Sequence, residues 1–214
     1  MTIRERAAKI VAVLKEEYPS SCSLVSTADW QLLFATRLSA QCTDERVNIV
    51  TKELYSRFPT LQSLAEADLE EICEIVRPCG LFRTKANDIK NSAGQLITRF
   101  GGKVPDTMEE LLSLPGVGRK TANLILGDIF GKPAIVADTH CIRISNRLGL
   151  CDTKDPHKVE LALKKIIEPA EQSDFCHRLV HFGRDKCMAR GPRCGECPLS
   201  GLCPEGALRA KTAG

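Results

Sequence analysis

The chain has 214 residues, of which 43% are hydrophobic and 27% are charged, and its net charge is only +3. These values are ordinary for a soluble globular protein with one large or two small domains, and so small a charge does not by itself indicate a nucleic-acid partner. No apolar run is long enough to cross a membrane, and residues 1–6 lack the apolar core of a signal peptide. We therefore expect a cytoplasmic protein that does not bind a membrane.

Helical periodicity runs along almost the whole chain. Apolar residues at helical spacing predict a first helix that begins near Ile3, with Thr2 and Glu5 able to form a capping box at its start. The other predicted helices are residues 29–39, 43–57, 68–76, 82–99, 107–113, 118–130, 138–148, 155–167 and 172–185. No segment alternates apolar and polar residues as a strand requires, so the predicted fold class is all-α.

Eleven cysteines divide into a cluster and a scattered remainder. The seven scattered cysteines lie mostly in apolar helical patterns, and we expect them to be reduced and buried. The cluster has the spacing C-x6-C-x2-C-x5-C and consists of Cys187, Cys194, Cys197 and Cys203. So many thiolates in so short a segment predict a metal centre that serves as the core of the loop. Structural zinc sites usually pair two C-x2-C knuckles, and because this loop has one, the residues alone favour iron–sulfur over zinc only slightly.

A glycine-rich turn separates two predicted helices in the middle of the chain. Residues 111–122 read Leu-Leu-Ser-Leu-Pro-Gly-Val-Gly-Arg-Lys-Thr-Ala. The amides of Gly116 and Gly118, together with the N-terminus of the following helix, suit a phosphate group. The turn does not follow a strand, as a dinucleotide-binding loop would, and Arg119 interrupts the order of a Walker A loop. A plain helical turn is the alternative, but the flanking residues favour phosphate binding.

Two further side chains are candidates for chemistry. Lys120 would lie in the first turn of the helix after the hairpin, where the dipole disfavours an ammonium and so favours the nucleophilic, neutral amine. From its position alone, a second phosphate contact explains it equally well. Asp138 follows an apolar run and precedes Thr139, and a helix N-cap explains this context better than catalysis does.

These motifs, in this order, resemble the endonuclease III family of DNA glycosylases with abasic-site lyase activity. The resemblance is carried by residues 114–122, by Val-Ala-Asp-Thr-His at residues 136–140 and by the cysteine spacing, and it begins at Leu-Ser-Ala-Gln in residues 38–41. It implies a helix-hairpin-helix glycosylase fold with two helical domains. The first would span residues 22–132, and the second would combine residues 1–21 with 133–214 and carry the cluster loop. The family's cofactor is a [4Fe–4S] cluster.

The resemblance also implies roles for individual residues. Lys120 matches the catalytic nucleophile, and Asp138 matches the carboxylate that stabilises positive charge at the sugar and assists proton transfer. Gln41 and Leu81 match residues that occupy the space left by a flipped base. His140 either reaches the lesion pocket or is a partly buried helix residue. The remaining predicted DNA contacts are those of the hairpin and of the basic cluster loop: Gly116, Gly118, Arg119, Thr121, Arg184, Lys186, Arg190 and Arg193.

One segment departs from the family pattern. Where the family has His-Gly-Arg shortly before the first cluster cysteine, this chain has Phe182-Gly183-Arg184, with His181 one place earlier. We expect this exchange to change either the local packing or the hydrogen bonding of the pocket.

The function implied by the resemblance is base excision repair. The enzyme would remove oxidised pyrimidines from damaged double-stranded DNA through a lysine Schiff base, cut the strand 3′ to the abasic site by β-elimination, and act as a monomer. Two alternatives stay open: a related mismatch or adenine glycosylase, and a non-catalytic iron–sulfur protein that binds DNA. Covalent trapping on damaged or abasic duplex with borohydride separates the enzyme from the binding protein.

Overall fold

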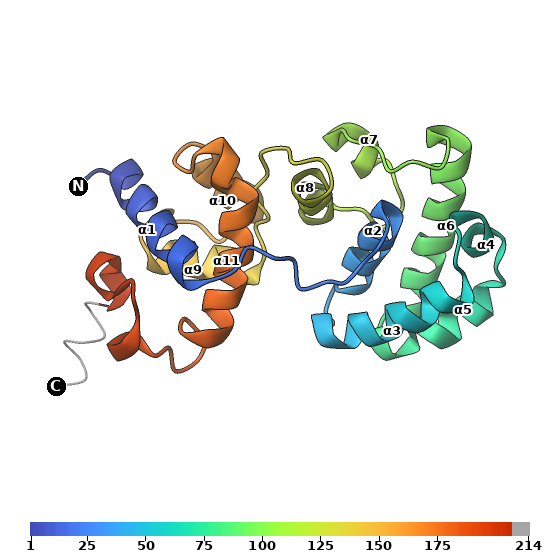
Figure 1. Cartoon of the computed structure of the whole chain (residues 1–214), viewed down its shortest axis with the longest axis horizontal. Helices are drawn as coiled ribbons and strands as arrows, with labels where there is room; N and C mark the ends of the chain where they lie inside the picture. The colour runs from blue at the N-terminus through green and yellow to red at the C-terminus, as the bar shows by residue number, and fades with distance from the viewer. Residues whose placement is uncertain (207–214) are drawn as a thin grey trace. The chain divides into compact units, whose positions relative to one another are not determined.

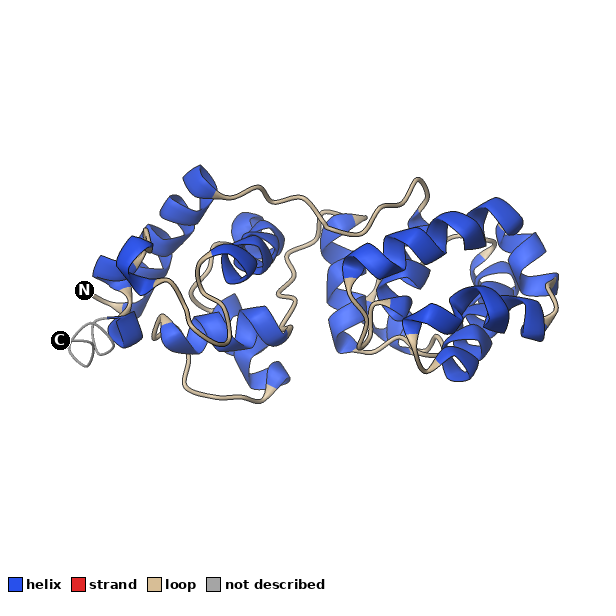
Figure 2. Cartoon of the chain, turned by 90° about the horizontal axis from the view of Figure 1, so that it is seen from below, coloured by secondary structure: helices blue, strands red, loops and turns tan. Residues whose placement is uncertain are grey.

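The computed structural model describes residues 1–206, which form helices joined by turns and contain no strand (Figures 1 and 2). The all-α prediction is confirmed. By their internal contacts the helices divide into two compact units, one made of Met1–Ser21 with the chain from Gly131 onward, the other of Cys22–Phe130. None of the helices in the described residues has both the length and the apolar character needed to span a bilayer.

The unit formed by Cys22–Phe130 is built around its longest helix, α6. Helices α4 and α5 pack against α6, and α2 contacts α3, α6 and α8. On α6 the side chains of Ile89, Ala93 and Leu96 are completely buried, which follows from their spacing along one helical face. The elements of this unit are α2 (Asp29–Leu38), α3 (Asp44–Arg57), α4 (Leu61–Glu66), α5 (Leu69–Val76), η1 (Arg77–Cys79), α6 (Phe82–Phe100), α7 (Met108–Leu112) and α8 (Arg119–Asp128).

The other unit packs its last long helix, α11, against α1 and α9. The predicted capping box of α1 is present: the Glu5 amide donates to the Thr2 hydroxyl at 3.2 Å, and the Glu5 carboxylate accepts the Thr2 amide at 2.8 Å. The elements of this unit are α1 (Ile3–Glu17), α9 (Thr139–Arg147), α10 (Pro156–Lys164), η2 (Pro169–Glu171), α11 (Gln172–Asp185), η3 (Cys194–Glu196) and η4 (Ser200–Leu202). The last two lie in the segment of the clustered cysteines.

Phe182, where the chain departs from the family pattern, is a core residue. Its side chain is 1% exposed and meets Tyr18 edge-on, with 5.6 Å between the ring centroids. His181, one place earlier, lies 3.2 Å through Nε2 from the Ser21 carbonyl oxygen. The exchange therefore places an aromatic ring in the packing between α11 and the end of α1. Of the two expected effects, this is the change in local packing.

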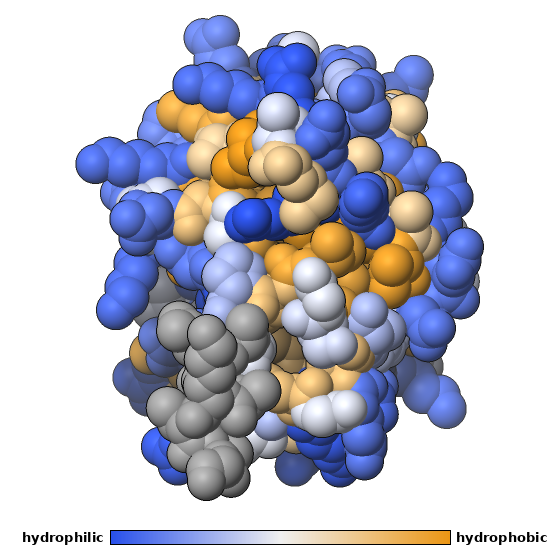
Figure 3. Space-filling model, turned by 90° about the vertical axis from the view of Figure 1, so that its left-hand side faces the viewer, coloured by the Kyte–Doolittle hydropathy of each residue, from blue (hydrophilic) through white to orange (hydrophobic). Residues whose placement is uncertain are grey.

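Most large apolar side chains are buried, and the exceptions are informative. On the face shown in Figure 3, apolar residues cross the middle and hydrophilic residues surround them. Among the described residues, the exposed large apolar side chains are Met1, Ile3, Val25, Ile49, Leu81, Leu112 and Leu161. Leu81 is 58% exposed and is the only one of them with a left-handed backbone. An exposed leucine in a disfavoured conformation is unusual enough to suggest a role beyond packing.

Candidate functional site

The glycine turn joins α7 to α8 as a hairpin, and the two helices pack together. Leu114 and Val117, 3% and 8% exposed, anchor it in the core. Gly116 has a φ of +72°, in the left-handed region that disfavours any residue with a Cβ. Gly118 is extended instead, with φ −96° and ψ 176°, and is the N-cap of α8. Of the two positions, only Gly116 has a backbone conformation that requires glycine.

Side chains from α2 and α6 hold this turn in place. The Arg37 guanidinium binds one oxygen of the Asp88 carboxylate, with Nη2 at 2.6 Å and Nε at 2.8 Å from Oδ2. A Cβ added to Gly116 would come within 2.5 Å of this oxygen, so the ion pair lies against the turn itself. Ser92 donates its hydroxyl to the Pro115 carbonyl at 2.9 Å. These contacts position the main chain of the turn before any ligand binds.

The first turn of α8 carries the predicted nucleophile. Lys120 is exposed, so its amine is accessible to a substrate, and Arg119 beside it is half-buried. Thr121, the next residue, is only 8% exposed, and its side chain packs in the interior. A phosphate contact by this residue would have to use its main-chain N–H group.

Asp138 and His140 lie at the start of α9. Asp138 is half-buried and caps the helix, since its Oδ1 accepts the Cys141 N–H at 2.7 Å, which confirms the N-cap interpretation. His140 is half-buried, with Nδ1 3.2 Å from Nη2 of Arg143. A Cβ added to Gly183 of α11 would meet this ring nitrogen at 2.5 Å. His140 therefore has the contacts of a packed helix residue, and its DNA contact stays a prediction.

Gln41 and Leu81, the predicted inserting residues, share a rare feature. Both are exposed, and they are the two non-glycine residues of the described chain with a positive φ, 57° and 48° respectively. This conformation costs roughly 1–2 kcal/mol for a residue with a Cβ. Gln41 follows the end of α2, and Leu81 is the N-cap of α6. Disfavoured backbone conformations of this kind concentrate at functional sites.

The four clustered cysteines line one cavity, whose walls also include the buried side chains of Leu148 and Phe182. N–H groups lie near two of the sulfurs: Arg147 Nη1 is 3.4 Å from Sγ of Cys187, and the Gly206 amide is 3.3 Å from Sγ of Cys203. Four soft sulfurs with N–H donors and apolar walls fit a metal centre with thiolate ligands. Burial raises the pKa of the Cys203 thiol, so a metal centre must displace its proton on binding.

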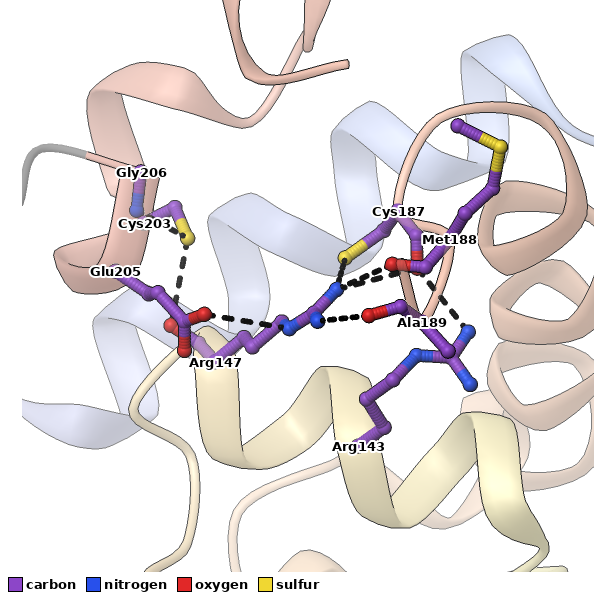
Figure 4. A network of polar contacts seen from close by, with 8 residues as sticks. All are labelled: Arg143, Arg147, Cys187, Met188, Ala189, Cys203, Glu205 and Gly206. Carbon is purple, nitrogen blue, oxygen red and sulfur yellow. Dashed lines mark hydrogen bonds and ion pairs between the residues drawn. The ribbon is translucent and has the colours of Figure 1, made fainter. Parts of the chain in front are cut away.

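Arg147, the last residue of α9, joins the two ends of the cysteine loop (Figure 4). Its guanidinium donates to the Met188 carbonyl at 2.7 Å and to the Ala189 carbonyl at 3.1 Å, and its Nε lies 3.4 Å from the Glu205 carboxylate. Arg143, one turn earlier, adds a bond to the Cys187 carbonyl at 3.1 Å. Sequence reasoning missed both arginines, because a basic residue near the end of a helix ordinarily signals only favourable interaction with the dipole.

The basic residues in the cysteine loop and just before it differ in their exposure. Arg184, Arg190 and Arg193 are exposed, as a phosphate contact requires. Lys186 is half-buried, and its ammonium lies 3.2 Å from the Glu196 carboxylate. Its charge is therefore partly neutralised within the loop.

Comparison with known families gives two matches. The profile of the HhH-GPD superfamily of base excision DNA repair proteins matches residues 34–169. The profile of the iron–sulfur binding domain of endonuclease III matches residues 187–203, which begin and end at clustered cysteines. The predicted [4Fe–4S] cofactor is confirmed by this second match, and the choice that the residues left open between zinc and iron–sulfur is decided for iron–sulfur.

Individual proteins are similar along nearly the whole chain. Endonuclease III of Synechocystis sp. is 47% identical over 203 residues, which cover 94% of this chain and 93% of the relative. Endonuclease III of Bacillus subtilis is 44% identical over 193 residues, covering 90% and 88%. Among solved structures, a trapped endonuclease III–DNA covalent intermediate with an estranged adenine superposes with a TM-score of 0.92 at 42% identity, covering 98% of this chain and 100% of that one.

Proposed function

Because the chain belongs to the endonuclease III family of base excision DNA repair proteins, we propose that it is a bifunctional DNA glycosylase and abasic-site lyase. The observation that carries this proposal is the exposed Lys120 in the first turn of α8, directly after the glycine hairpin. A solved relative forms a trapped covalent intermediate with DNA, and an accessible lysine amine is the group through which this chain would do the same.

The proposed substrate is duplex DNA that contains an oxidised pyrimidine. An enzyme that acts on a base must take it out of the stack, and the space left behind must be filled. Leu81 supplies an exposed apolar side chain that can part the neighbouring base pairs, and Gln41 supplies an amide that can bond the unpaired partner base. The exposure and the left-handed backbone of both residues support this assignment.

In the proposed reaction, Lys120 Nζ forms a bond to the sugar C1′, the glycosidic bond breaks, and the base leaves with the bonding electrons and takes up a proton. Opening of the sugar ring gives an imine between Lys120 and C1′. The imine draws electrons and so acidifies the C2′ proton. Loss of this proton breaks the C3′–O bond, which cuts the strand 3′ to the lesion. Asp138 is assigned the stabilisation of positive charge at C1′ and the transfer of protons.

The hairpin and the cysteine loop are assigned to the DNA backbone. The main-chain amides of Gly116 and Gly118 and the N-terminus of α8 suit one phosphate, and the exposed Arg184, Arg190 and Arg193 suit others. When bound to the four cysteines, the [4Fe–4S] cluster supplies the cross-link that folds the loop. The covalent chemistry belongs to Lys120 and Asp138. The cytoplasmic location and the monomeric state stay predictions from the sequence.

Borohydride trapping tests this function. The imine is reduced to a stable amine, so the wild-type protein should form a covalent adduct with duplex DNA that contains thymine glycol or an abasic site. Lys120→Ala should form no detectable adduct, whereas Lys103→Ala, which changes another exposed lysine of the same unit, should trap as well as the wild type. An adduct formed by Lys120→Ala would show that another residue is the nucleophile.

A further inference from the structure

One buried ammonium connects the two turns that carry Gln41 and Leu81. Lys85, the fourth residue of α6, has a relative exposure of 0%. Its Nζ donates to three main-chain carbonyls, those of Leu38 at 2.9 Å, Ala40 at 2.7 Å and Cys79 at 2.7 Å. An ammonium has three protons, so each one has an acceptor.

The three acceptors belong to the segments that lead into the two left-handed residues. The Leu38 carbonyl belongs to the last residue of α2, the Ala40 carbonyl directly precedes Gln41, and the Cys79 carbonyl ends η1 two residues before Leu81. Each segment also has one short turn bond of its own, from the Cys42 amide to Ser39 and from the Gly80 amide to Arg77. Through Lys85 the two turns, 40 residues apart in sequence, share a single anchor.

Burial of this charge costs free energy, which indicates that the three contacts of the ammonium have a role. Burial lowers the pKa of Lys85, because the ammonium has lost its water. The three carbonyl oxygens take the place of part of that water as hydrogen-bond acceptors. An apolar residue of similar length would fill the space without the cost of burying a charge. It would also leave the three carbonyls without their shared donor and the two turns without their common support.

We propose that Lys85 is a positioning residue for base extrusion: it holds the Gln41 and Leu81 turns together in the left-handed conformations from which both side chains enter the DNA. The inference rests on the proposed function, since it needs Gln41 and Leu81 to insert. Lys85 itself has no contact with the substrate in this role, because its ammonium is fully enclosed. Its effect on the reaction passes through the geometry of the two turns.

The test compares a step that needs extrusion with one that does not. Lys85→Met should slow removal of thymine glycol from duplex DNA at least about tenfold, because a shift of about 1 Å in a positioned group can cost about a hundredfold. The fluorescence increase of 2-aminopurine placed next to the lesion should fall in parallel. Trapping on a single-stranded abasic oligonucleotide, where no base pair is opened, should stay within about twofold of the wild type.

A matched control lies on the same helix. Lys90 is half-buried, and its ammonium also donates to a main-chain carbonyl, that of Ala67, away from both turns. Lys90→Met should leave the ratio of duplex to single-stranded activity unchanged. An equal fall of both activities in Lys85→Met would mean that Lys85 only supports folding, and no fall of either would mean that the two turns do not depend on it. A wild-type protein without extrusion or trapping would instead refute the proposed function.

Hydrogen exchange on the wild type provides a second measurement that does not depend on folding of the variant. If Lys85 fixes both turns, the Cys42 and Gly80 amides should exchange at least about a hundredfold more slowly than in an unstructured chain. Exchange of either amide at the unprotected rate would overturn the inference, because the turn would then open freely despite its contact with Lys85.

Discussion

Replacement of Gly116 by alanine should destabilise the unit formed by Cys22–Phe130 far more than the same replacement at Gly118. The Gly116 backbone is left-handed, which costs roughly 1–2 kcal/mol for an alanine. The added Cβ would also lie 2.5 Å from the Asp88 carboxylate oxygen and 2.8 Å from Cδ of Arg37, so the ion pair must move. Hydrogen bonds to charged groups contribute about 1.5–3 kcal/mol each, and loss of one brings the expected total to about 3 kcal/mol.

At Gly118 the structure has room for the new methyl group. No atom lies within 4 Å of an added Cβ there, and the backbone is extended. Gly118→Ala should therefore cost no more than about 1 kcal/mol, through a poorer N-cap. For a chain of this size, 1 kcal/mol shifts the melting temperature by about 2–4 °C, so Gly116→Ala should melt about 6–12 °C below the wild type.

Thermal melting of the iron-loaded protein, followed by circular dichroism, is the assay. Midpoints are compared instead of extrapolated free energies, because a protein with two units and a cofactor need not unfold in one step. In an Arg37→Ala background the Gly116→Ala shift should shrink toward the backbone cost alone, since part of the crowding is gone. Equal shifts for Gly116→Ala and Gly118→Ala would refute the reasoning from φ and crowding.

Substitutions at two further residues, Asp138 and Arg147, separate structural from chemical roles. Asp138→Asn keeps a good N-cap residue, so the variant should melt at the wild-type temperature while its base removal falls at least about a hundredfold. Asp138→Ala should show the same fall in base removal and should also lose about 1 kcal/mol of stability. Full activity in Asp138→Asn would leave Asp138 as a cap only. Arg147→Ala should lose iron to a chelator at least about tenfold faster than the wild type, as measured by iron content per chain. Arg147→Lys should retain iron little better than Arg147→Ala, because one ammonium cannot make all the contacts of the guanidinium. Equal rates of iron loss in Arg147→Ala and the wild type would show that the loop does not depend on Arg147.

Helical periodicity predicted most elements to within a few residues. The predicted helix at residues 43–57 is α3, Asp44–Arg57, and that at residues 172–185 is α11 with the same bounds. The periodic pattern missed α4, Leu61–Glu66, because six residues are too few to establish a period. It also extended residues 155–167 past the end of α10 at Lys164, since Ile166 and Ile167 continue the apolar face through a turn.

The site was predictable where spacing alone carries the chemistry. The cysteine spacing predicted one metal loop, and the structure places all four side chains around one cavity. Contacts between distant segments were not predictable in this way. Lys85 did leave a signal, because it lies four residues before Ile89 on the apolar face of α6, where a charge must find partners. The hairpin motif did not show that the Thr121 side chain is buried, since it does not reveal which face of α8 packs in the core.

The two ends of α9 connect the cysteine loop to the predicted chemistry. Asp138 caps the first turn of the helix, and Arg147 at the other end holds the main chain of the loop next to Cys187. Nine helical residues span only about 14 Å, and a short helix transmits a displacement of one end to the other because it moves as a rigid element. A cluster that does no more than fold the loop can therefore influence Asp138, so dependence of activity on iron would not by itself imply electron transfer.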